Sequence, residues 1–557
     1  MCRVHAGGAS RRHAARQLFP CDTRRASGSL RRPSPAGNGV RRVRQPSRRH
    51  VARPVRGLAQ GKGHPVGGCA IPARPLRTGL RRPPLSRPAG AQQADRHGAQ
   101  HNRDTSRMSD TVVFVSLAGN QSAFFAALEP SVRAAGRDVV HVCFHEGSVS
   151  ELRKAAHRVF NPFELSRSGD LPSFEAYGIE NPALLIAHEK AAYEIRDTQA
   201  LLLKFRRHLA AMEAVFATLA GEGRRIVVVQ ELGGFTSVLA AYFVAQRHGV
   251  SNYFIEPSFF KGRFFLTRDS FSAPRIGRSA GSAGAEVLAV LGRIRDSQTV
   301  VIPVKDALHY RGAMRKLTDP KNWRRLVEKL VQKHVLKQQE EFQHIGGHVR
   351  RHVRMTMNAA KLRKFYAQIP DESPFLYYPL HVPADFALTI RSPEYLDQLS
   401  LIDFLCRVAP GGRKVVIKEH PALIGALPAA RVVELMRRHD NLVLLSPGIN
   451  NHEVLRRAET VVTVNSKAGA EALLYCRPVL ALGDSFYRDS GLVTVVDALR
   501  DLPDRLAGAA LPDEEDVNRF LQDVWSASVP GELYDVREEN VAEFAASLLG
   551  VLDAEKR

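Results

Sequence analysis

The chain has 557 residues, a formal net charge of +24 and 44% hydrophobic residues. This length suffices for two or three domains with sizeable cores. No stretch approaches the ~20 consecutive apolar residues of a membrane span, and the six cysteines show no CxxC or zinc-ligand spacing. These features argue against a membrane-spanning protein and a disulfide scaffold. They predict a cytoplasmic protein, either soluble or peripheral at the inner membrane.

Most of the positive charge lies at the start of the sequence. Residues 1–107 hold 24 Lys and Arg against three Asp and Glu, so the rest of the chain carries only +3. A segment so poor in apolar residues cannot bury a core and is predicted to be disordered. It is either a basic arm for nucleic acid or anionic lipid, or upstream sequence that is not translated. The second interpretation is favoured because Met108 directly precedes a strand-like run, so no nucleic-acid partner is expected.

Residues 108–304 alternate between apolar runs and helical patterns, which is typical of a parallel sheet with crossover helices. Strands are expected at 112–118, 139–144, 225–229 and 253–255, and helices at 122–134, from 149 onward, and at 237–247. Asn181 and Pro182 resemble an N-cap and a first helical residue. They predict one long helix, with apolar positions from Leu185 to Leu219. This part is interpreted as a Rossmann-like domain.

Residues 305–370 form a basic helical insertion. Between 305 and 366 there are 16 Lys and Arg against five Asp and Glu, and the sequence from 322 to 342 has helical periodicity. A charge run of this kind is usually a solvated helix face. The alternative is a surface that rests on anionic lipid.

Residues 371–557 give the clearest pattern. Strands are expected at 375–378, 414–418, 442–445, 461–464 and 478–482, and helices at 393–408, 429–438, 450–458 and 467–475. Five βα repeats predict a second doubly wound sheet, followed by a helical tail after Asp513. The fold class is therefore α/β, with two Rossmann-like domains, a basic insertion and C-terminal helices.

Ligands of open parallel sheets bind beyond the carboxyl ends of the strands. The polar residues that follow predicted strands here are Glu256, His381, Asp385, His420, Asn465, Ser466 and Asp484. Loop residues are commonly polar, so no single position is diagnostic, whereas the whole set predicts one site. No cluster with metal-ligand spacing is evident, so no metal and no other cofactor is expected.

Several positions have both a structural and a functional interpretation. The KEHP sequence at 418–421 is either a turn in which proline ends the strand or a phosphate site, with His420 as donor and Lys418 as positive charge. Glu256 is either a structural residue, as a helix cap or ion-pair member, or a general acid/base whose pKa is raised by aromatic neighbours. Asp385 either forms an Asx turn or acts as a nucleophilic carboxylate.

The stretch 460–482 contains a strand, turn, helix and strand in succession. Asn465 or Ser466 can cap the helix, and Gly469 permits a close approach to its first turn. Free backbone N–H groups at this turn favour an anion. Any α/β protein contains such a unit, so this feature alone does not establish a phosphate site.

Four motifs make the chain resemble the capsule polysaccharide biosynthesis family of Gram-negative bacteria, which is related to the retaining β-Kdo transferases. The motifs are FIEPSFF with Glu256, YYPLHVPADFAL with His381 and Asp385, VIKEHP with His420, and VNSKAGAEALLYCRPVLALGDSFY with Ser466, Gly469 and Glu471. The resemblance extends over residues 111–498. It departs from the family pattern at Pro257-Ser258, where Gly is usual, at His381, where Gln is commoner, and in the length of the basic insertion.

The resemblance implies a GT-B-like arrangement in which two Rossmann-like domains face a cleft, with 108–304 as acceptor domain and 371–557 as nucleotide domain. It implies a glycosyltransferase that moves a sugar, Kdo from CMP-Kdo, to a lipid-linked acceptor with retention at an anionic membrane surface. Asp385 and Glu256 would be catalytic. The implied nucleotide-binding residues are Lys418, His420, Pro421, Asn465, Ser466, Gly469 and Glu471. The alternative is a non-catalytic capsule assembly or export factor that uses the same fold as a binding module. Other capsule assembly proteins are further expected partners.

Overall fold

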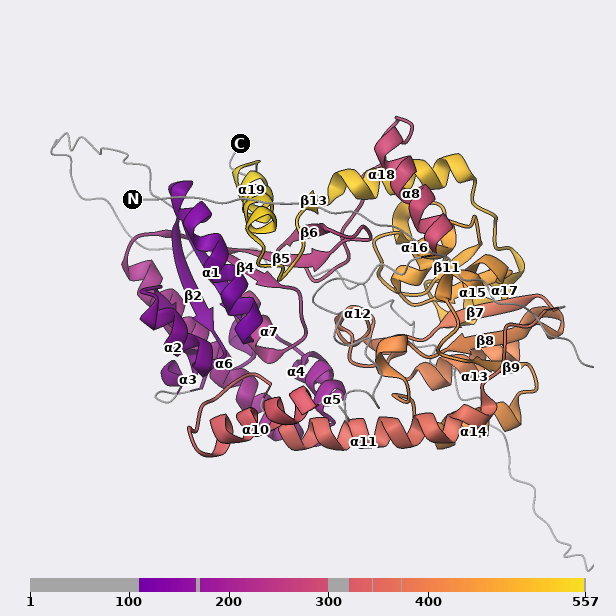
Figure 1. Ribbon diagram of the computed structural model, residues 1–557, viewed down its shortest axis with the longest axis horizontal. Helices are drawn as coiled ribbons and strands as arrows, with labels where there is room; N and C mark the ends of the chain where they lie inside the picture. Colours follow the sequence, from indigo (N-terminus) through magenta and orange to yellow (C-terminus); the bar gives the residue numbers. More distant parts are fainter. Residues whose placement is uncertain (1–109, 167–170, 299–319, 343, 372, 555–557) are drawn as a thin grey trace, which may run out of the picture. The chain divides into compact units, whose positions relative to one another are not determined.

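The computed structural model describes residues 110–166, 171–298, 320–342, 344–371 and 373–554. These ranges contain two sheets, each with helices on both faces (Figure 1). The expected α/β class with two Rossmann-like halves is confirmed. The segment 1–107 that was expected to be disordered, and residues 305–319 of the basic insertion, lie outside the described residues.

The first sheet has the strand order β13-β6-β5-β4-β1-β2-β3. Its parallel strands are β1 (Asp110–Ser116), β2 (Asp138–Cys143), β3 (Val159–Phe160), β4 (Arg225–Glu231) and β5 (Ser251–Pro257). The order 3-2-1-4-5 reverses direction between β1 and β4, as in a Rossmann half. An antiparallel edge that the sequence pattern did not predict is formed by β6 (Arg263–Arg268) and β13 (Val529–Pro530).

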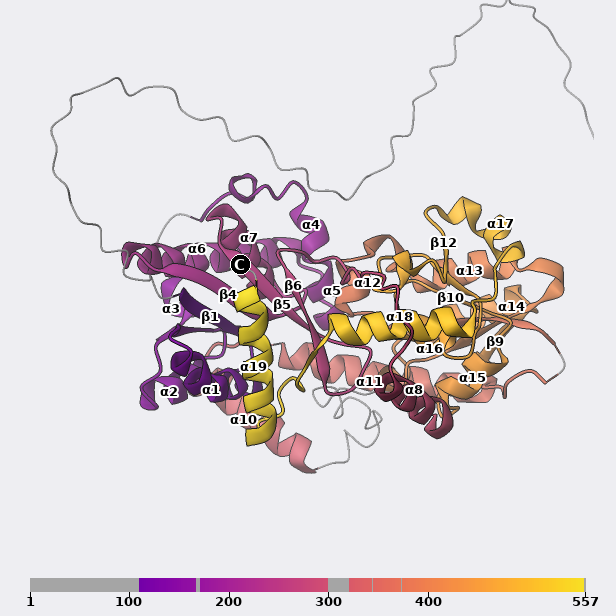
Figure 2. The ribbon, with the colours of Figure 1, turned by 90° about the horizontal axis from the view of Figure 1, so that it is seen from above.

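Alternate residues of β1 face two different helix layers. The helices that cover this sheet include α1 (Gly119–Ala134), α2 (Glu146–Lys154), α6 (Thr198–Gly221), α7 (Thr236–Arg247) and α19 (Glu538–Ala554). Val113 and Val115 pack against α6 and α7, whereas Val112 and Phe114 pack against α1 and α19. Figures 1 and 2 show α19 beside α1, so the C-terminal tail completes the core of the first half.

The prediction of a single long helix after Asn181 is wrong. The chain instead forms α4 (Pro182–Leu185), α5 (Ala187–Tyr193) and α6. Glu194 ends α5 in the left-handed backbone region with a φ of 57°, and the Asp197 side chain begins α6 by accepting a hydrogen bond from Ala200 N at 3.0 Å. Apolar residues on both sides of the break pack into the same core, so periodicity did not reveal it.

The second sheet has the order β12-β11-β10-β7-β8-β9, and all of its pairs are parallel. Its strands are β7 (Phe375–Pro379), β8 (Lys414–Lys418), β9 (Leu442–Leu445), β10 (Thr460–Thr463), β11 (Val479–Ala481) and β12 (Thr494–Val495). The strand order reverses between β7 and β10. This switch point is where a doubly wound sheet presents its ligand site.

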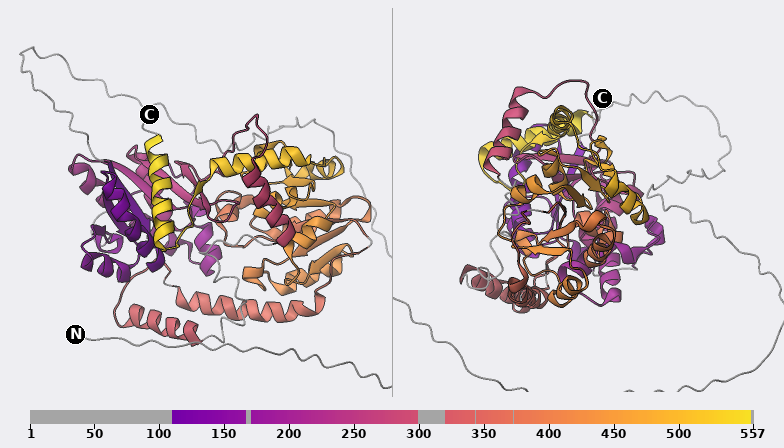
Figure 3. Two further views of the ribbon diagram at one scale, coloured as in Figure 1. Left: turned by 45° about the horizontal axis from the view of Figure 1, so that its top comes forward. Right: turned by 90° about the vertical axis from the view of Figure 1, so that its right-hand side faces the viewer.

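Helices cover both faces of the second sheet. They include α13 (Gln398–Val408), α14 (Ala429–Arg438), α15 (Asn451–Arg457), α16 (Lys467–Leu473), α17 (Leu502–Ala507), α18 (Glu514–Ala527) and α8 (Ala285–Ser297). Tyr378 and Ile417 face the layer of α13 and α14, whereas Tyr377 and Val416 face α15 and α16. On that second face α8 and α18 are in contact (Figure 3).

The described part of the basic insertion consists of α10 (Pro320–His334) and α11 (Ile345–Leu362). Contacts of α11 reach both halves, because Arg351 donates to Ala192 O at 2.9 Å and Asn358 donates to Gly425 O at 3.0 Å. Within the described ranges, every helix is too short or too polar to cross a lipid bilayer.

Candidate functional site

The switch point of the second sheet brings the ends of β7 and β10 together. His381 follows β7, Asn465 follows β10, and the backbone N–H of Asn465 donates to His381 Nε2 at 3.2 Å. Gln398 fixes the His381 backbone, since its Oε1 accepts from His381 N at 2.8 Å and its Nε2 donates to His381 O at 3.1 Å. Two residues predicted at strand ends are therefore in direct contact, through positions set by the sheet.

The His381 imidazole holds one buried polar atom without a partner. The residue is 8% exposed, and burial lowers its pKa to about 4. Because Nε2 accepts a hydrogen bond, the proton of the neutral ring lies on Nδ1. No hydrogen-bond acceptor for Nδ1 is present among the described residues. His381 therefore offers an unused N–H donor at the switch point.

Lys418 ends the neighbouring strand β8 and is also buried, with 4% of its surface exposed. Burial lowers the pKa of its ammonium group to about 8, although the charge of Glu471 opposes this shift. In the part of the chain that the structure describes, the ammonium group forms no hydrogen bond or close ion pair. An ammonium group on so buried a residue is suited to pair with an anionic ligand.

The KEHP turn at residues 418–421 is held by local hydrogen bonds and by a buried hydrogen-bond network around Glu419. His420 Nδ1 accepts from Ala422 N at 3.3 Å and caps a short 3₁₀ helix that begins at Pro421, a role that the sequence did not predict. Glu419 is buried and accepts from Tyr366 Oη and Gly425 N, both at 2.8 Å. These bonds fix the backbone that carries Lys418.

Glu471 lies on α16 beneath the same strand ends. Its Oε2 accepts from Asn451 Nδ2 at 2.8 Å, and Asn451 Oδ1 accepts from the Tyr377 hydroxyl at 2.7 Å. This carboxylate is buried and contributes negative charge near Lys418. Asn451 was not identified from the sequence, because nothing distinguishes it from an ordinary first residue of a helix.

Asn465 and Ser466 connect β10 to α16. The Asn465 amide donates to Ala387 O at 2.6 Å and to Ser392 Oγ at 3.2 Å, while its Oδ1 is buried and has no donor among the described residues. The Ser466 hydroxyl caps α16 by accepting from Ala468 N at 3.2 Å, as predicted. Asn465 Oδ1 is thus an unused acceptor on the residue whose backbone contacts His381.

The anion site expected at the first turn of α16 is closed in this structure. The N–H groups of Ser466, Ala468 and Gly469 already donate to Thr463 Oγ1, Ser466 Oγ and Ser466 O. A Cβ at Gly469 would lie 2.4 Å from the Tyr487 hydroxyl oxygen, and that hydroxyl donates to Ser466 O at 2.6 Å. The close approach that Gly469 permits is made by the buried Tyr487 ring.

Glu256 forms a bidentate ion pair with Arg391, which the sequence analysis did not identify. Arg391 Nη1 and Nη2 lie 3.0 and 2.7 Å from Glu256 Oε1 and Oε2. Arg391 also donates to Phe271 O at 2.6 Å and Ser272 O at 3.1 Å, and its side chain is 5% exposed. Of the two interpretations left open for Glu256, this structure contains the ion pair.

Asp385 is exposed and caps α12 (Phe386–Thr389) by accepting from Ala387 N at 3.0 Å. Its charge nevertheless acts on the site. Burial lowers the pKa of Arg391, but the charges of Glu256, Asp484 and Asp385 outweigh burial and raise it. Of these carboxylates, Glu256 contacts Arg391 directly, whereas Asp484 and Asp385 act on it through their charge.

Comparison with known proteins agrees with the motifs over part of the chain. The family model described as capsule polysaccharide biosynthesis protein matches residues 322–504, about a third of the chain, and agrees with the expected family over that segment. A stretch of 159 residues is 33% identical to protein FixF of Sinorhizobium fredii (strain NBRC 101917 / NGR234). This match covers 27% of the chain and 37% of FixF, so it spans little more than a third of that relative.

Similar solved structures have low sequence identity. The beta Kdo 2,7 transferase of Thermosulfurimonas dismutans KpsC is 14% identical, with 66% of this chain and 95% of that chain covered and a TM-score of 0.30. The beta Kdo 2,4 transferase of the same KpsC is 13% identical, with 57% and 88% covered and a TM-score of 0.27. The UDP-GlcNAc 2-epimerase of Methanocaldococcus jannaschii is 10% identical, with 75% of this chain and 99% of that chain covered and a TM-score of 0.26. TM-scores this low do not bear on the reaction of this chain.

Proposed function

We propose that the chain is a glycosyltransferase of capsule polysaccharide biosynthesis that transfers Kdo from CMP-Kdo to a lipid-linked acceptor with retention. The observation that supports this function is the buried, unused donor His381 Nδ1 at the end of β7, next to strand β8, which ends at the buried residue Lys418. Unsatisfied buried donors destabilise a fold, and the anionic oxygens of a nucleotide phosphate would satisfy them.

In this proposal the nucleotide lies at the switch point. Lys418 supplies positive charge, His381 and His420 donate to the phosphate, and Pro421 directs the chain away from the strand end. Asn465 Oδ1, which has no donor among the described residues, accepts from a ribose hydroxyl or the cytosine amino group. Ser466 and Gly469 keep the turn tight around Tyr487, and Glu471 maintains the charge of Lys418. These last three residues therefore support the site and do not contact the nucleotide.

The proposed chemistry is a double displacement. An Asp385 oxygen bonds to the anomeric carbon as the bond from that carbon to the phosphate oxygen breaks, and the electron pair leaves with CMP. The acceptor hydroxyl oxygen then bonds to the same carbon, the bond to Asp385 breaks, and its electron pair returns to the carboxylate. The hydroxyl proton passes to Glu256, which becomes available after one of its two bonds to Arg391 opens.

A second candidate is a binding module that assembles or exports capsule material without catalysis. The specific observation in its favour is that both proposed catalytic carboxylates already have structural partners. Asp385 caps α12, and Glu256 is paired with Arg391. A protein that only binds the nucleotide would need neither carboxylate for chemistry.

Incubation of the full chain with a panel of nucleotide sugars and a lipid-linked acceptor tests the proposal. Release of CMP from CMP-Kdo that depends on the acceptor, with Kdo recovered on the lipid, is the expected result. Nucleotide binding without release would favour the binding module. Release of another nucleotide would overturn the assignment of the donor.

We also propose that α10 rests on an anionic membrane. Its large apolar residues are exposed along one helical face: Trp323, Val327, Leu330, Val331 and, just beyond the helix, Val335. With about 100° of rotation per residue, Arg324 and Lys333 border that face on its two sides. A helix with an exposed apolar face and basic flanks is suited to lie in the headgroup region of a bilayer. This contact would hold the enzyme beside its lipid acceptor.

A further inference from the structure

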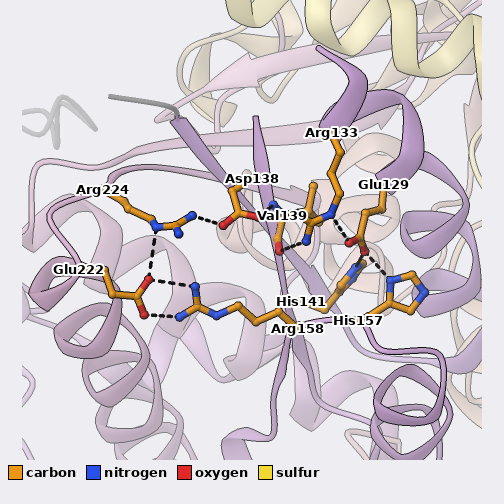
Figure 4. Close-up of polar contacts among 9 residues, drawn as sticks. All are labelled: Glu129, Arg133, Asp138, Val139, His141, His157, Arg158, Glu222 and Arg224. Carbon is orange, nitrogen blue, oxygen red and sulfur yellow. Dashed lines mark hydrogen bonds and ion pairs between the residues drawn. The ribbon is translucent and has the colours of Figure 1, made fainter. Parts of the chain in front are cut away.

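A second polar cluster lies in the first half of the molecule, away from the proposed nucleotide site. Glu129 comes from α1, His141 from the middle of β2, and His157 from the loop before β3 (Figure 4). Glu129 is 5% exposed and His141 is fully buried. The cluster thus joins three separate elements at one point of the core.

The cluster is arranged around a single carboxylate oxygen. Glu129 Oε2 lies 2.8 Å from His141 Nε2 and 2.5 Å from His157 Nδ1. The other oxygen, Oε1, accepts from Arg133 Nε at 2.6 Å, and Arg133 also donates to Asp138 at 2.6 Å. Figure 4 shows Arg133 on the opposite side of the carboxylate from the two imidazoles. The carboxylate is therefore oriented by an arginine while its second oxygen faces both rings.

Burial makes this cluster unusual. His141 shares a strand face with Val139 and Cys143, and Glu129 lies on the helix face that also buries Phe125 and Leu128. Ionisable side chains are rarely fully buried unless they are paired or coordinate a metal. Here the helix and the sheet each place one such residue at the same point of their contact.

Two imidazole nitrogens and one carboxylate oxygen are a donor set that zinc-class ions prefer. The three candidate ligand atoms lie within 4.8 Å of one another. Zinc–ligand distances of about 2.0–2.2 Å place neighbouring ligand atoms about 3.3 Å apart, so the side chains need to separate by less than about 1 Å. The ion would replace the protons now shared between the rings and the carboxylate.

We propose that Glu129, His141 and His157 bind one divalent transition metal ion of the zinc class. His157 has a side chain 21% exposed, which provides an entry path and room for a water molecule as fourth ligand. The site lies beside the middle of β2, away from the switch points of both sheets, so the ion fastens α1 to the β2–β3 edge and takes no part in transfer. The ligands are 12 and 28 positions from Glu129, a spacing without a recognisable sequence signature.

Metal titration of the full chain tests the site. The protein is stripped with a chelator, and Zn²⁺ and Co²⁺ binding are followed by calorimetry, by visible Co²⁺ absorption and by the shift in melting temperature. The unmodified chain should bind one more ion than His157→Ala, with a melting temperature raised by Zn²⁺ only in the unmodified chain. His248→Ala is the matched control, since His248 also pairs with a carboxylate, Glu213, at 2.7 Å on the surface.

The unmodified chain and its variants share the histidines and cysteines elsewhere in the sequence, which can also bind metal. Only the difference between them in the number of bound ions therefore tests the site. Glu129→Gln provides a second variant, because it keeps the shape of the side chain and removes its charge. It should lower Zn²⁺ affinity at least tenfold. Equal stoichiometry and equal Zn²⁺-dependent melting shifts in the unmodified chain, His157→Ala and Glu129→Gln would overturn the proposal.

Discussion

Arg391 donates to both carboxylate oxygens of Glu256, and this pair joins the end of β5 in the first sheet to the loop after α12. Bidentate guanidinium–carboxylate contacts are strong and directional. Lys467 makes a second connection between the two halves, since its ammonium group donates to the backbone oxygens Pro257 O at 3.0 Å and Ser258 O at 2.6 Å. The strand-end glutamate therefore has a positioning role before any catalytic one.

A double-mutant cycle measures how much this ion pair contributes to the free energy of unfolding. Glu256→Gln leaves the buried Arg391 without its carboxylate and should lower the free energy of unfolding by about 3 kcal/mol. Glu256→Gln and Arg391→Met together should be less destabilising than the sum of the single changes, with a coupling energy of about 1–3 kcal/mol from urea unfolding. A coupling energy near zero would show that the two side chains do not interact in solution.

Most parallel strands of both sheets were predictable because they are apolar, β-branched runs at regular spacing, whereas β3 and β12, with two residues each, are too short to show such a pattern. The break between α5 and α6 was not, since it depends on the capping carboxylate of Asp197 and the backbone of Glu194. Nor was β13, because it pairs with β6 across more than 260 positions of sequence. The strand β6 pairs with the adjacent β5, in a stretch where the sequence predicted no strand.

In the candidate site, the sequence placed polar residues at strand ends but did not give their partners. Arg391 is 135 positions from Glu256, and the Asn465–His381 contact spans 84 positions. Gly469 was identified by its backbone freedom, yet the group that uses the space is Tyr487, 18 positions away. Local patterns thus predict which residues reach the edge of the sheet, whereas tertiary packing decides what each one contacts.

Nucleotide affinity should depend on pH through Lys418. Burial lowers the pKa of this ammonium group to about 8, so the free protein loses the charge as the pH rises through that value. If CMP binds the protonated form, its affinity is highest below about pH 8 and falls by up to tenfold per pH unit above it. Calorimetric titration of CMP between about pH 7 and pH 10 should show this decline in the unmodified chain and in the control Lys414→Met. Lys418→Met should bind more weakly at pH 7 and lose the slope; parallel profiles would exclude Lys418 as a ligand.

The stability of the fold should depend on pH through Glu341. Lys204 Nζ lies 2.7 Å from Glu341 and 2.8 Å from Glu189, and burial raises the pKa of Glu341 to about 7. Below its unfolded-state pKa of about 4.5, Glu341 is protonated in both states and its contribution to stability is fully present. As the pH rises towards 7 only the unfolded chain loses the proton, so the free energy of unfolding falls by up to about 1.4 kcal/mol per pH unit.

Urea unfolding at several pH values between about 4.5 and 8 measures this contribution. Glu341→Gln should remove the decline. Glu340→Gln, at the adjacent position, should retain it because Glu340 pairs separately with Lys329 at 3.0 Å. A profile for Glu341→Gln identical to that of the unmodified chain would show that Glu341 does not titrate in this range.

Membrane binding through α10 should need both its apolar face and its basic flank. Trp323→Ser with Val327→Ser removes apolar area from an exposed face, and Arg324→Glu with Lys333→Glu reverses two charges, each worth about 1 kcal/mol near an anionic surface. Either pair of changes should reduce cosedimentation with anionic vesicles by at least tenfold. Leu511→Ser, at an exposed leucine away from α10, should have no effect. Equal binding of the unmodified chain to neutral and anionic vesicles would contradict the role of charge.

The roles of His420 and Asp385 can be separated by comparing binding with turnover. His420→Ala removes a proposed phosphate donor and should weaken CMP binding by about 1.5–3 kcal/mol. Asp385→Asn keeps a side-chain oxygen that can accept from Ala387 N, so α12 should remain capped, but the amide cannot form the ester to the anomeric carbon. It should abolish transfer while CMP affinity stays within a factor of about three, because the lost interaction is made during chemistry and not in binding. Substantial turnover by Asp385→Asn would rule out the double displacement, and normal CMP binding by His420→Ala would remove that residue from the nucleotide site.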